Sequence, residues 1–276
     1  MWAGGKTKML KNYTEMIPQE ITSYCEPFVG GGAMFIHIKQ EHNPKKVVLN
    51  DIYEPLINIY KSIRDDVDSF IKNVNALQEK YIQLETKEKR KEFYYKVRTK
   101  HAWDFESMTK TQEAAFLFFL MKTGFNGILQ INKNTNGRYG TPAGLLNQKN
   151  VVYDIDNVKW WNEALQGVDL LSGNWEDSTK DLSDDTFFFF DPPYRASFAD
   201  YGSAFNDKEL AKLISFAENK NRVIVCNRDD EEYFTNLSTT LNKTFFPVTY
   251  TAGRRKKVEN GYEAKKATEV ALWSNK

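Results

Sequence analysis

The alternation of apolar and polar positions along the chain predicts strands and helices in turn. Short apolar runs closed by polar or glycine residues are typical of buried strands, and longer amphipathic stretches are typical of helices. The predicted strands are 23–28, 46–50, 186–190, 222–226, 244–250 and 268–273. The helices predicted between them are 8–17, 33–40, 207–218 and 230–241. This order predicts an α/β fold with a doubly wound, Rossmann-like sheet.

The middle of the chain has a different pattern. Its helical stretches are long and charged or apolar, and a segment rich in Gly and Asn follows them. These stretches are 61–81, 86–100 and 112–121, followed by 124–144. We therefore predict a mainly helical insertion over 59–146, within a discontinuous domain made of 1–58 and 147–276. Asn134-Thr135-Asn136-Gly137 has the turn chemistry of a β-hairpin tip in that insertion.

Composition adds limits to this picture. The 276 residues are 41% hydrophobic, which is enough for a substantial core. Because 38 basic residues balance 37 acidic ones, any surface for nucleic acid must be local. Cys25 and Cys226 lack the spacing of a disulfide framework or a metal site, so we expect reduced thiols in a cytoplasmic protein and no metal. No apolar run reaches the roughly 20 residues of a membrane span, and we expect no membrane partner.

The tetrapeptide Asp191-Pro192-Pro193-Tyr194 follows directly on four phenylalanines, Phe187–Phe190. A buried strand therefore ends in a carboxylate, carbonyls whose direction the two prolines restrict, and an aromatic ring. Ligands of open α/β sheets bind at the carboxyl ends of the strands. Such an edge suits the exocyclic amino group of a flat base, although a simple proline-rich turn would have the same sequence.

A glycine-rich segment follows the first predicted strand. Gly30-Gly31-Gly32 allows a tight turn and close approach to a ligand at the start of a helix. The second strand ends at Asp51, 19 residues after Gly32, where an acidic residue can bind a ribose hydroxyl or cap the next helix. Both NAD and S-adenosylmethionine carry this ribose, so the pattern alone leaves a dehydrogenase and a methyltransferase open.

Several motifs together resemble those of the Dam-type (D12 class) DNA adenine-N6 methyltransferases. The resemblance covers nearly the whole chain in one order. Its motifs are 2–6, 28–35, 50–51, 125–127 with 141–144, 191–194 and 266–270. It implies a methyltransferase sheet with a target-recognition insertion, and transfer of a methyl group from S-adenosylmethionine to N6 of an adenine flipped out of double-stranded DNA.

The resemblance also implies roles for individual residues. Asp191, Pro192, Pro193 and Tyr194 would form the catalytic edge, and Tyr194 would stack on the adenine. Asp51 would bind the ribose of the cofactor, and Ile52 would pack on its adenine. The other residues expected around the cofactor are Trp2, Lys6, Phe28, Gly30 and Gly32, together with Asp191.

The inserted segment is expected to recognise the target sequence. Its polar side chains at and near the hairpin could contact base edges in the major groove. These residues are Asn126, Gln130, Asn132, Lys133, Asn134, Asn136 and Arg138. The tip is longer than in relatives that read GATC and has Asn136 where a basic residue is expected, so the target sequence stays open. A later basic cluster, Arg254, Arg255, Lys256 and Lys257, suits phosphate contacts.

Other functions remain possible on the residues alone. Transfer to cytosine N4, or to an amide of protein or RNA, could use the same tetrapeptide, although such enzymes more often have Ser or Asn at the position of Asp191. A DNA-binding protein that keeps the cofactor pocket without catalysis is a further alternative. We expect a monomer or a weak dimer on DNA, in the cytoplasm of a prokaryotic cell or a virus-infected host cell.

Overall fold

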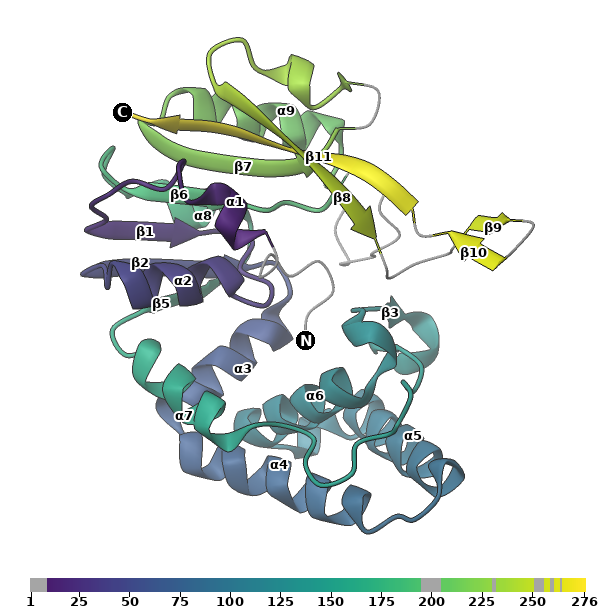
Figure 1. Ribbon diagram of the computed structural model, residues 1–276. Coiled ribbons are helices and arrows are strands. Elements are labelled where there is room, and N and C mark those ends of the chain that lie inside the picture. The colour runs from purple at the N-terminus through teal and green to yellow at the C-terminus, as the bar shows by residue number, and fades with distance from the viewer. Residues whose placement is uncertain (1–8, 195–204, 230–231, 251–255, 259–260, 264) are drawn as a thin grey trace. The chain divides into compact units, whose positions relative to one another are not determined.

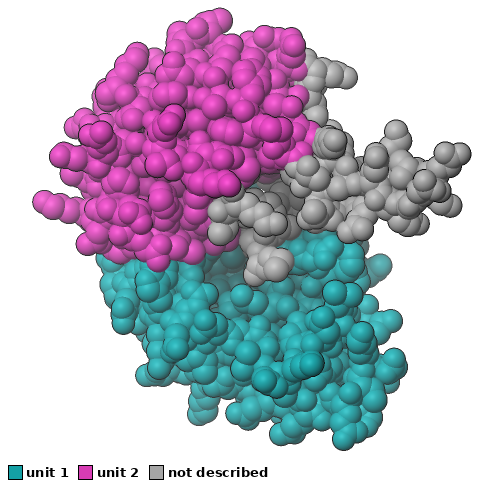
Figure 2. All heavy atoms as spheres, viewed as in Figure 1, with its two compact units in different colours: residues 1–5, 49–175, 199–203 teal, residues 6–48, 176–198, 204–276 magenta. Residues whose placement is uncertain are grey.

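The computed structural model describes residues 9–194, 205–229, 232–250, 256–258, 261–263 and 265–276 (Figure 1). The chain forms two compact units, which are coloured separately in Figure 2. The helical unit comprises Leu49–Trp175 with residues 1–5 and 199–203. The sheet unit comprises Lys6–Val48, Glu176–Phe198 and Ala204–Lys276.

A mostly parallel sheet of seven strands has the order β5-β2-β1-β6-β7-β11-β8 (Figure 1). Its strands are β1 Ser23–Glu26, β2 Lys46–Asp51, β5 Asp169–Ser172, β6 Phe187–Phe190, β7 Arg222–Arg228, β8 Asn242–Tyr250 and β11 Lys265–Asn275. Strand β6 runs parallel to β1 and β7, whereas β11 is antiparallel to both β7 and β8. The predicted α/β class is confirmed, and each predicted strand is present.

Strand β6 is buried on both faces of the sheet. All four of its phenylalanines are at most 1% exposed. Phe188 and Phe190 pack edge-to-face against Phe216 of helix α9 (Asp207–Glu218), with ring centroids 5.6 and 6.0 Å apart. Phe189 points to the other face, where it packs on Tyr13. An unbroken apolar run is what a strand covered on both faces requires.

Helices dominate the helical unit. They are α3 Glu54–Asp65, α4 Val67–Ile82, α5 Lys87–Trp103, α6 Lys110–Thr123 and α7 Ile155–Ala164. The predicted helix 61–81 is wrong as a single element, because the chain breaks at Asp66, whose backbone is not helical (φ −150°, ψ 57°). Among the described residues, no helix is both long and apolar enough to cross a membrane.

The predicted β-hairpin is confirmed in the helical unit. Strands β3 (Ile131–Asn132) and β4 (Arg138–Tyr139) are antiparallel, and Ile131 is paired with Tyr139. A 3-10 turn, η4 (Lys133–Thr135), is followed by Asn136 and Gly137 with φ of 54° and 68°. Asn and Gly tolerate this left-handed conformation better than other residues. A second short hairpin, β9 (Lys256–Val258) with β10 (Gly261–Glu263), lies near the end of the chain.

Two predicted helices of the sheet unit are wrong in extent. Helix α1 covers only Leu10–Tyr13 of the predicted 8–17, and bonds from the amides of Met16 and Ile17 to the Tyr13 carbonyl close a turn after it. The described residues of 230–241 contain no α-helix, only 3-10 structure such as the turn η6 (Thr235–Leu237).

The physical reason for the missing helix is local competition for backbone donors. Asp229 accepts bonds from both the amide and the hydroxyl of Thr235. Glu218 accepts from the amide of Thr239 and from the hydroxyl of Ser238. Side-chain oxygens that bind nearby donors offer the backbone an alternative to the helix.

The other helices of this region are α2 Ala33–Glu41, α8 Trp175–Thr179 and α9, which has the predicted bounds.

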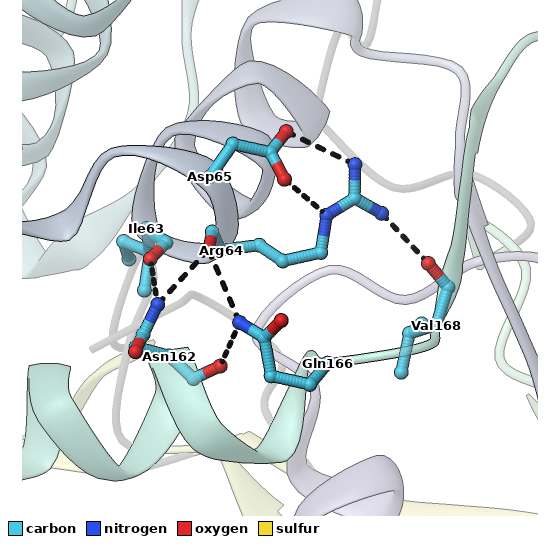
Figure 3. Close-up of polar contacts among 6 residues, drawn as sticks. All are labelled: Ile63, Arg64, Asp65, Asn162, Gln166 and Val168. Atoms are coloured by element: carbon cyan, nitrogen blue, oxygen red, sulfur yellow. Dashed lines mark hydrogen bonds and ion pairs between the residues drawn. The ribbon is translucent and has the colours of Figure 1, made fainter.

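Polar side chains join helices α3 and α7 in the helical unit (Figure 3). Asn162 of α7 donates to the carbonyls of Ile63 and Arg64 at 2.7 and 3.0 Å. Arg64 donates to the Val168 carbonyl at 2.7 Å and pairs with Asp65. The last carbonyls of a helix have no hydrogen-bond donor within the helix. Asn162 supplies donors to two such carbonyls at the end of α3.

We predict that Asn162→Ala lowers the free energy of unfolding by about 1–3 kcal/mol, because the Ile63 carbonyl loses its donor and the Arg64 carbonyl keeps only the exposed Gln166. Gln166→Ala, two residues after the end of the same helix, is the matched control, since Gln166 is exposed and donates to the same Arg64 carbonyl. Urea unfolding of the two variants tests this. An equal or larger loss in Gln166→Ala would contradict the interpretation.

Candidate active site

The predicted catalytic tetrapeptide leaves the sheet at the end of β6. Asp191–Tyr194 has no regular secondary structure; Pro192 is buried and the other three residues are half-buried. Because Phe190 is paired with Val225 of the parallel strand β7, this exit lies at the carboxyl end of the two strands. A carboxylate and rigid carbonyls are therefore partly accessible at the edge where α/β proteins bind ligands.

Tyr13 packs beneath this exit on one face of the sheet. Its ring meets Phe189 of β6 and Phe246 of β8 edge-to-face, with centroids 6.0 and 5.6 Å away. Burial raises the pKa of the Tyr13 hydroxyl far above its usual value, and Cys226 and Asp191 raise it further. The hydroxyl thus stays protonated, as a neutral group within electrostatic reach of Asp191.

The glycine segment after β1 has the predicted conformation for a tight turn. Gly30 and Gly32 have φ of 46° and 64°, and Gly32 is the N-cap of α2. Phe28, just before them, packs edge-to-face on Phe190 and Phe205, with centroids 6.4 and 5.5 Å away. The turn therefore presents the amino end of a helix, where unpaired backbone amides favour polar or negatively charged ligand atoms.

We predict that Gly32→Ala lowers the free energy of unfolding by about 1–2 kcal/mol, because a side chain is strained at this positive φ. Gly31→Ala is the matched control, since Gly31 is not in the left-handed region. Thermal unfolding of both variants measures the difference. If Gly31→Ala were the more destabilised of the two, the assignment of strain to Gly32 would be wrong.

Strand β2 ends at Asp51, and Ile52 follows it; both lie in the helical unit. Asp51 is 8% exposed, and its Oδ1 accepts from the amide of Tyr53 at 3.0 Å. Tyr53, not Asp51, is the N-cap of α3, so the capping alternative for Asp51 is wrong. Ile52 is 44% exposed, unlike the buried apolar residues before it. A buried carboxylate is thus followed by an accessible apolar side chain.

The predicted base-reading residues differ in their accessibility. Gln130, Lys133, Asn134 and Asn136 are exposed on or beside the hairpin, and so is Asn126, on the 3-10 turn η3 (Phe125–Gly127). Asn132 instead faces the hairpin itself. Its Oδ1 accepts from the Thr135 hydroxyl at 3.2 Å, and an added Cβ at Gly140 would lie 2.3 Å from its Nδ2. The amide side chains of the other residues are therefore accessible to DNA, whereas that of Asn132 is used within the hairpin.

Arg138 is also turned toward protein. It forms an ion pair with Glu113 of α6, in which the two side chains are only 16% and 7% exposed. Its guanidinium carbon lies 3.9 Å from the centre of the Phe105 ring. One edge and one face of the guanidinium are therefore occupied. Residues Glu113 and Phe105 are not among the predicted site residues, although a lone acidic residue inside the apolar helix Lys110–Thr123 is a sequence signal for a buried partner.

His101 is fully buried in the same unit, and among the described residues neither ring nitrogen has a hydrogen-bond partner. Burial lowers its pKa from 6.5 to about 3, and the positive charge of Arg138 contributes to the shift. The ring is therefore neutral in the folded protein at pH 7.

The depressed pKa of His101 predicts acid sensitivity. Below about pH 6.5 the unfolded chain binds a proton at His101 that the folded chain does not, so the free energy of unfolding falls from there toward pH 3. His101→Leu should flatten this dependence, whereas His42→Leu, on a half-buried histidine after α2, should keep it. Urea unfolding across this range tests both. A wild-type slope in His101→Leu would contradict the assignment.

Several predicted site residues lie outside the described residues. These are Trp2, Lys6, Arg254 and Arg255. The backbone of Lys256 and Lys257 forms strand β9, but their side chains also lie outside the description. Among the described residues, no group of three or more His, Cys, Asp or Glu is arranged to hold a metal ion. Both cysteines are free thiols and buried.

Comparison with known proteins identifies the family. Residues 2–252 match the model of the D12 class N6 adenine-specific DNA methyltransferases. The Type II methyltransferase M.MjaIII of Methanocaldococcus jannaschii is 34% identical over 268 residues, which are 93% of this chain and 89% of that protein. The Type II methyltransferase M.CviBI of Paramecium bursaria Chlorella virus NC1A is 30% identical, with 78% and 76% covered. The Retron Ec67 DNA adenine methylase of Escherichia coli is 26% identical, with 98% and 88% covered.

The chain belongs to the D12 class of N6 adenine-specific DNA methyltransferases. The resemblance of its motifs to this class is confirmed. The family decides between the functions that the residues alone leave open, because it specifies transfer to adenine N6 rather than to cytosine N4 and excludes a nicotinamide dehydrogenase. The protein is accordingly a site-specific DNA adenine methyltransferase.

Proposed function

We propose that this enzyme methylates N6 of an adenine flipped out of double-stranded DNA, and that Asp191–Tyr194 is the edge that receives the base. One observation carries the proposal. A strand buried on both faces ends directly in this tetrapeptide, in a chain of the adenine-N6 class. The amine of adenine has two N–H donors, and the edge offers a carboxylate and a peptide carbonyl as acceptors.

Residues of the motifs that resemble the family's would hold S-adenosylmethionine as methyl donor. The amino end of α2, which begins after the left-handed Gly32, would bind polar atoms of the cofactor. The Asp51 carboxylate would bind the ribose hydroxyls, and the exposed Ile52 offers an apolar surface for the cofactor's adenine. Phe28 and Asp191 would line the methionine side, together with Trp2 and Lys6. When bound, the cofactor supplies a methyl group on a positively charged sulfur.

Asp191 and Pro192 would make the amine of the target adenine reactive. The lone pair of N6 is delocalised into the ring, which makes the amine a poor nucleophile. If the Asp191 carboxylate accepts one N–H and the Pro192 carbonyl the other, the nitrogen is held toward tetrahedral geometry with its lone pair directed outward. The gain comes from positioning and from placed dipoles, because the prolines hold the acceptors before the base arrives.

Tyr194 would hold the flipped base in place. An adenine inside a duplex is inaccessible to these acceptors, and flipping costs a few kcal/mol. Stacking on an aromatic ring returns roughly 1–3 kcal/mol of that cost. Tyr194 is half-buried two residues after Pro192, so part of its surface is accessible on the same edge.

We further propose that residues 59–146 recognise the target sequence, and that 1–58 with 147–276 form the catalytic domain. The exposed Gln130, Asn134 and Asn136 support this, because amide side chains bind adenine edges through paired hydrogen bonds. Lys133 and the basic cluster 254–257 would contact phosphates. A DNA substrate and two reduced thiols fit an enzyme of the cytoplasm, in a prokaryotic cell or a virus-infected host cell.

We predict that Asp191→Ala lowers the rate of methyl transfer by at least about 100-fold, because the amine loses a charged acceptor. Asp185→Ala, on an exposed carboxylate before β6, is the matched control and should keep the wild-type rate. The measurement is transfer of a labelled methyl group from S-adenosylmethionine to DNA from cells that lack adenine methylation. A folded Asp191→Ala protein that methylates DNA at nearly the wild-type rate would remove Asp191 from the mechanism.

A further inference from the structure

The hairpin β3–β4 is too short to hold its own shape. Each strand has only two residues, and an isolated two-stranded hairpin is marginally stable even when it is longer. The position of its tip must therefore be fixed by contacts with the helices beneath it. Three such contacts are made by buried or half-buried polar groups at the base of the hairpin.

Two of these contacts come from α5. The Arg98 Nη1 donates to the carbonyls of Gly140 and Thr141 at 2.9 and 3.1 Å. The Tyr94 hydroxyl donates to the same Thr141 carbonyl at 2.8 Å. These bonds hold the chain just after β4. At the tip, the Asn136 Nδ2 donates to the Ala102 carbonyl of α5, but over a long 3.4 Å. Strand β4 itself is left to be fixed by another contact.

The third contact is made by β4 itself. Arg138 pairs with Glu113 near the start of α6, and Phe105 covers one face of its guanidinium. The first turn of α6 is fixed by a capping box between Thr109 and Gln112, so Glu113 projects from a rigid position. Lys110 also approaches Glu113, at 3.8 Å, but its side chain is exposed. Removal of Arg138 or Glu113 therefore leaves the other, buried charge without its direct partner.

We propose that Arg138, Glu113 and Phe105 form a latch that fixes the tip of the hairpin and so sets how strictly the enzyme discriminates its target sequence. Arg138 is then a positioning residue, not the base contact that its place in the hairpin predicts. The tip residues Lys133, Asn134 and Asn136 are exposed and carry the contacts with DNA. The inference rests on the proposed function of this hairpin in target recognition.

The expected effect follows from the geometry of base recognition. Paired hydrogen bonds from an amide to a base edge need a defined position of the backbone that carries the amide. If the tip is loosened, the paired hydrogen bonds to the target bases weaken most, because the target makes all of them. Sites that differ from the target already lack some of these bonds and lose less. Loss of the latch should therefore reduce discrimination more than it reduces methylation as a whole.

The test compares Glu113→Gln, Arg138→Gln and the double variant with the wild type. Each protein methylates genomic DNA from cells without adenine methylation, and single-molecule sequencing maps the modified adenines. The wild-type map defines the target and the sites that differ from it by one base pair. Both single variants should lower the ratio of target to near-target methylation by about tenfold, and the double variant by no more than either, because the two residues act as one unit.

Lys133→Gln is the matched control, since it removes an exposed cation from the same hairpin. It should lower the salt dependence of DNA binding, whereas Arg138→Gln should leave this slope unchanged. A lower slope in Arg138→Gln, or a loss of discrimination in Arg138→Gln without one in Glu113→Gln, would show that Arg138 contacts DNA directly and would overturn the latch. Additive losses in the double variant would also contradict it.

A measurement without DNA separates the latch from the proposed function. Hydrogen exchange in Glu113→Gln should accelerate in 128–141 and stay as in the wild type in β6 and β7. Unchanged exchange in 128–141 would overturn the latch even if every variant methylates DNA. Absence of adenine methylation by the wild type would instead contradict the proposed function, and the exchange result would still decide whether the ion pair holds the hairpin.

Discussion

The complete burial of β6 is the constraint on which the rest of this structure depends. Phe188 and Phe190 are covered by α9 on one face, and Phe189 is covered by Tyr13 on the other. A strand in this position has no room for a charged side chain, so the first polar residue has to lie where the chain leaves the sheet. That residue is Asp191. The apolar run thereby fixes the place of the carboxylate as well as the core of the sheet.

The same constraint explains why the acceptors can be rigid. A reactive edge gains from acceptors that need no reorganisation when the base binds. Pro192 is buried against the sheet and Pro193 restricts the backbone before it, so the carbonyls have few alternative directions. Beneath them, Tyr13 keeps its proton beside Asp191. In the proposed mechanism the chemistry would take place at the end of this buried strand, and a short hairpin held by side chains would recognise the sequence.

Elements with strong local signals could be predicted from the sequence. The four phenylalanines of β6, the amphipathic α9 and the Asn-Gly turn of the hairpin each carry their own pattern, and all are confirmed. Strand β5 was missed because only one of its four residues is buried, and α7 was missed with it. The helix expected over 230–241 was wrong because Asp229 and Glu218 accept from the backbone amides of Thr235 and Thr239, which a helix would need. Such competition depends on contacts that local propensity does not contain.

The candidate site divides in the same way. The positions of Asp51 and Asp191 at the ends of strands could be predicted, because the apolar pattern of each strand shows where the strand ends. Arg138 is different, since its position in a hairpin predicted contact with DNA and its real partner, Glu113, is 25 residues away in the sequence. The structure was needed to show that this cation is turned inward.

The central claim concerns two hydrogen bonds to one amine, and a structure of the enzyme with DNA and an unreactive analogue of the cofactor tests it most directly. The account predicts a flipped adenine whose N6 lies about 2.7–3.2 Å from both the Asp191 carboxylate and the Pro192 carbonyl oxygen. An N6 more than about 4 Å from both oxygens in such a complex, beyond hydrogen-bond distance, would contradict it.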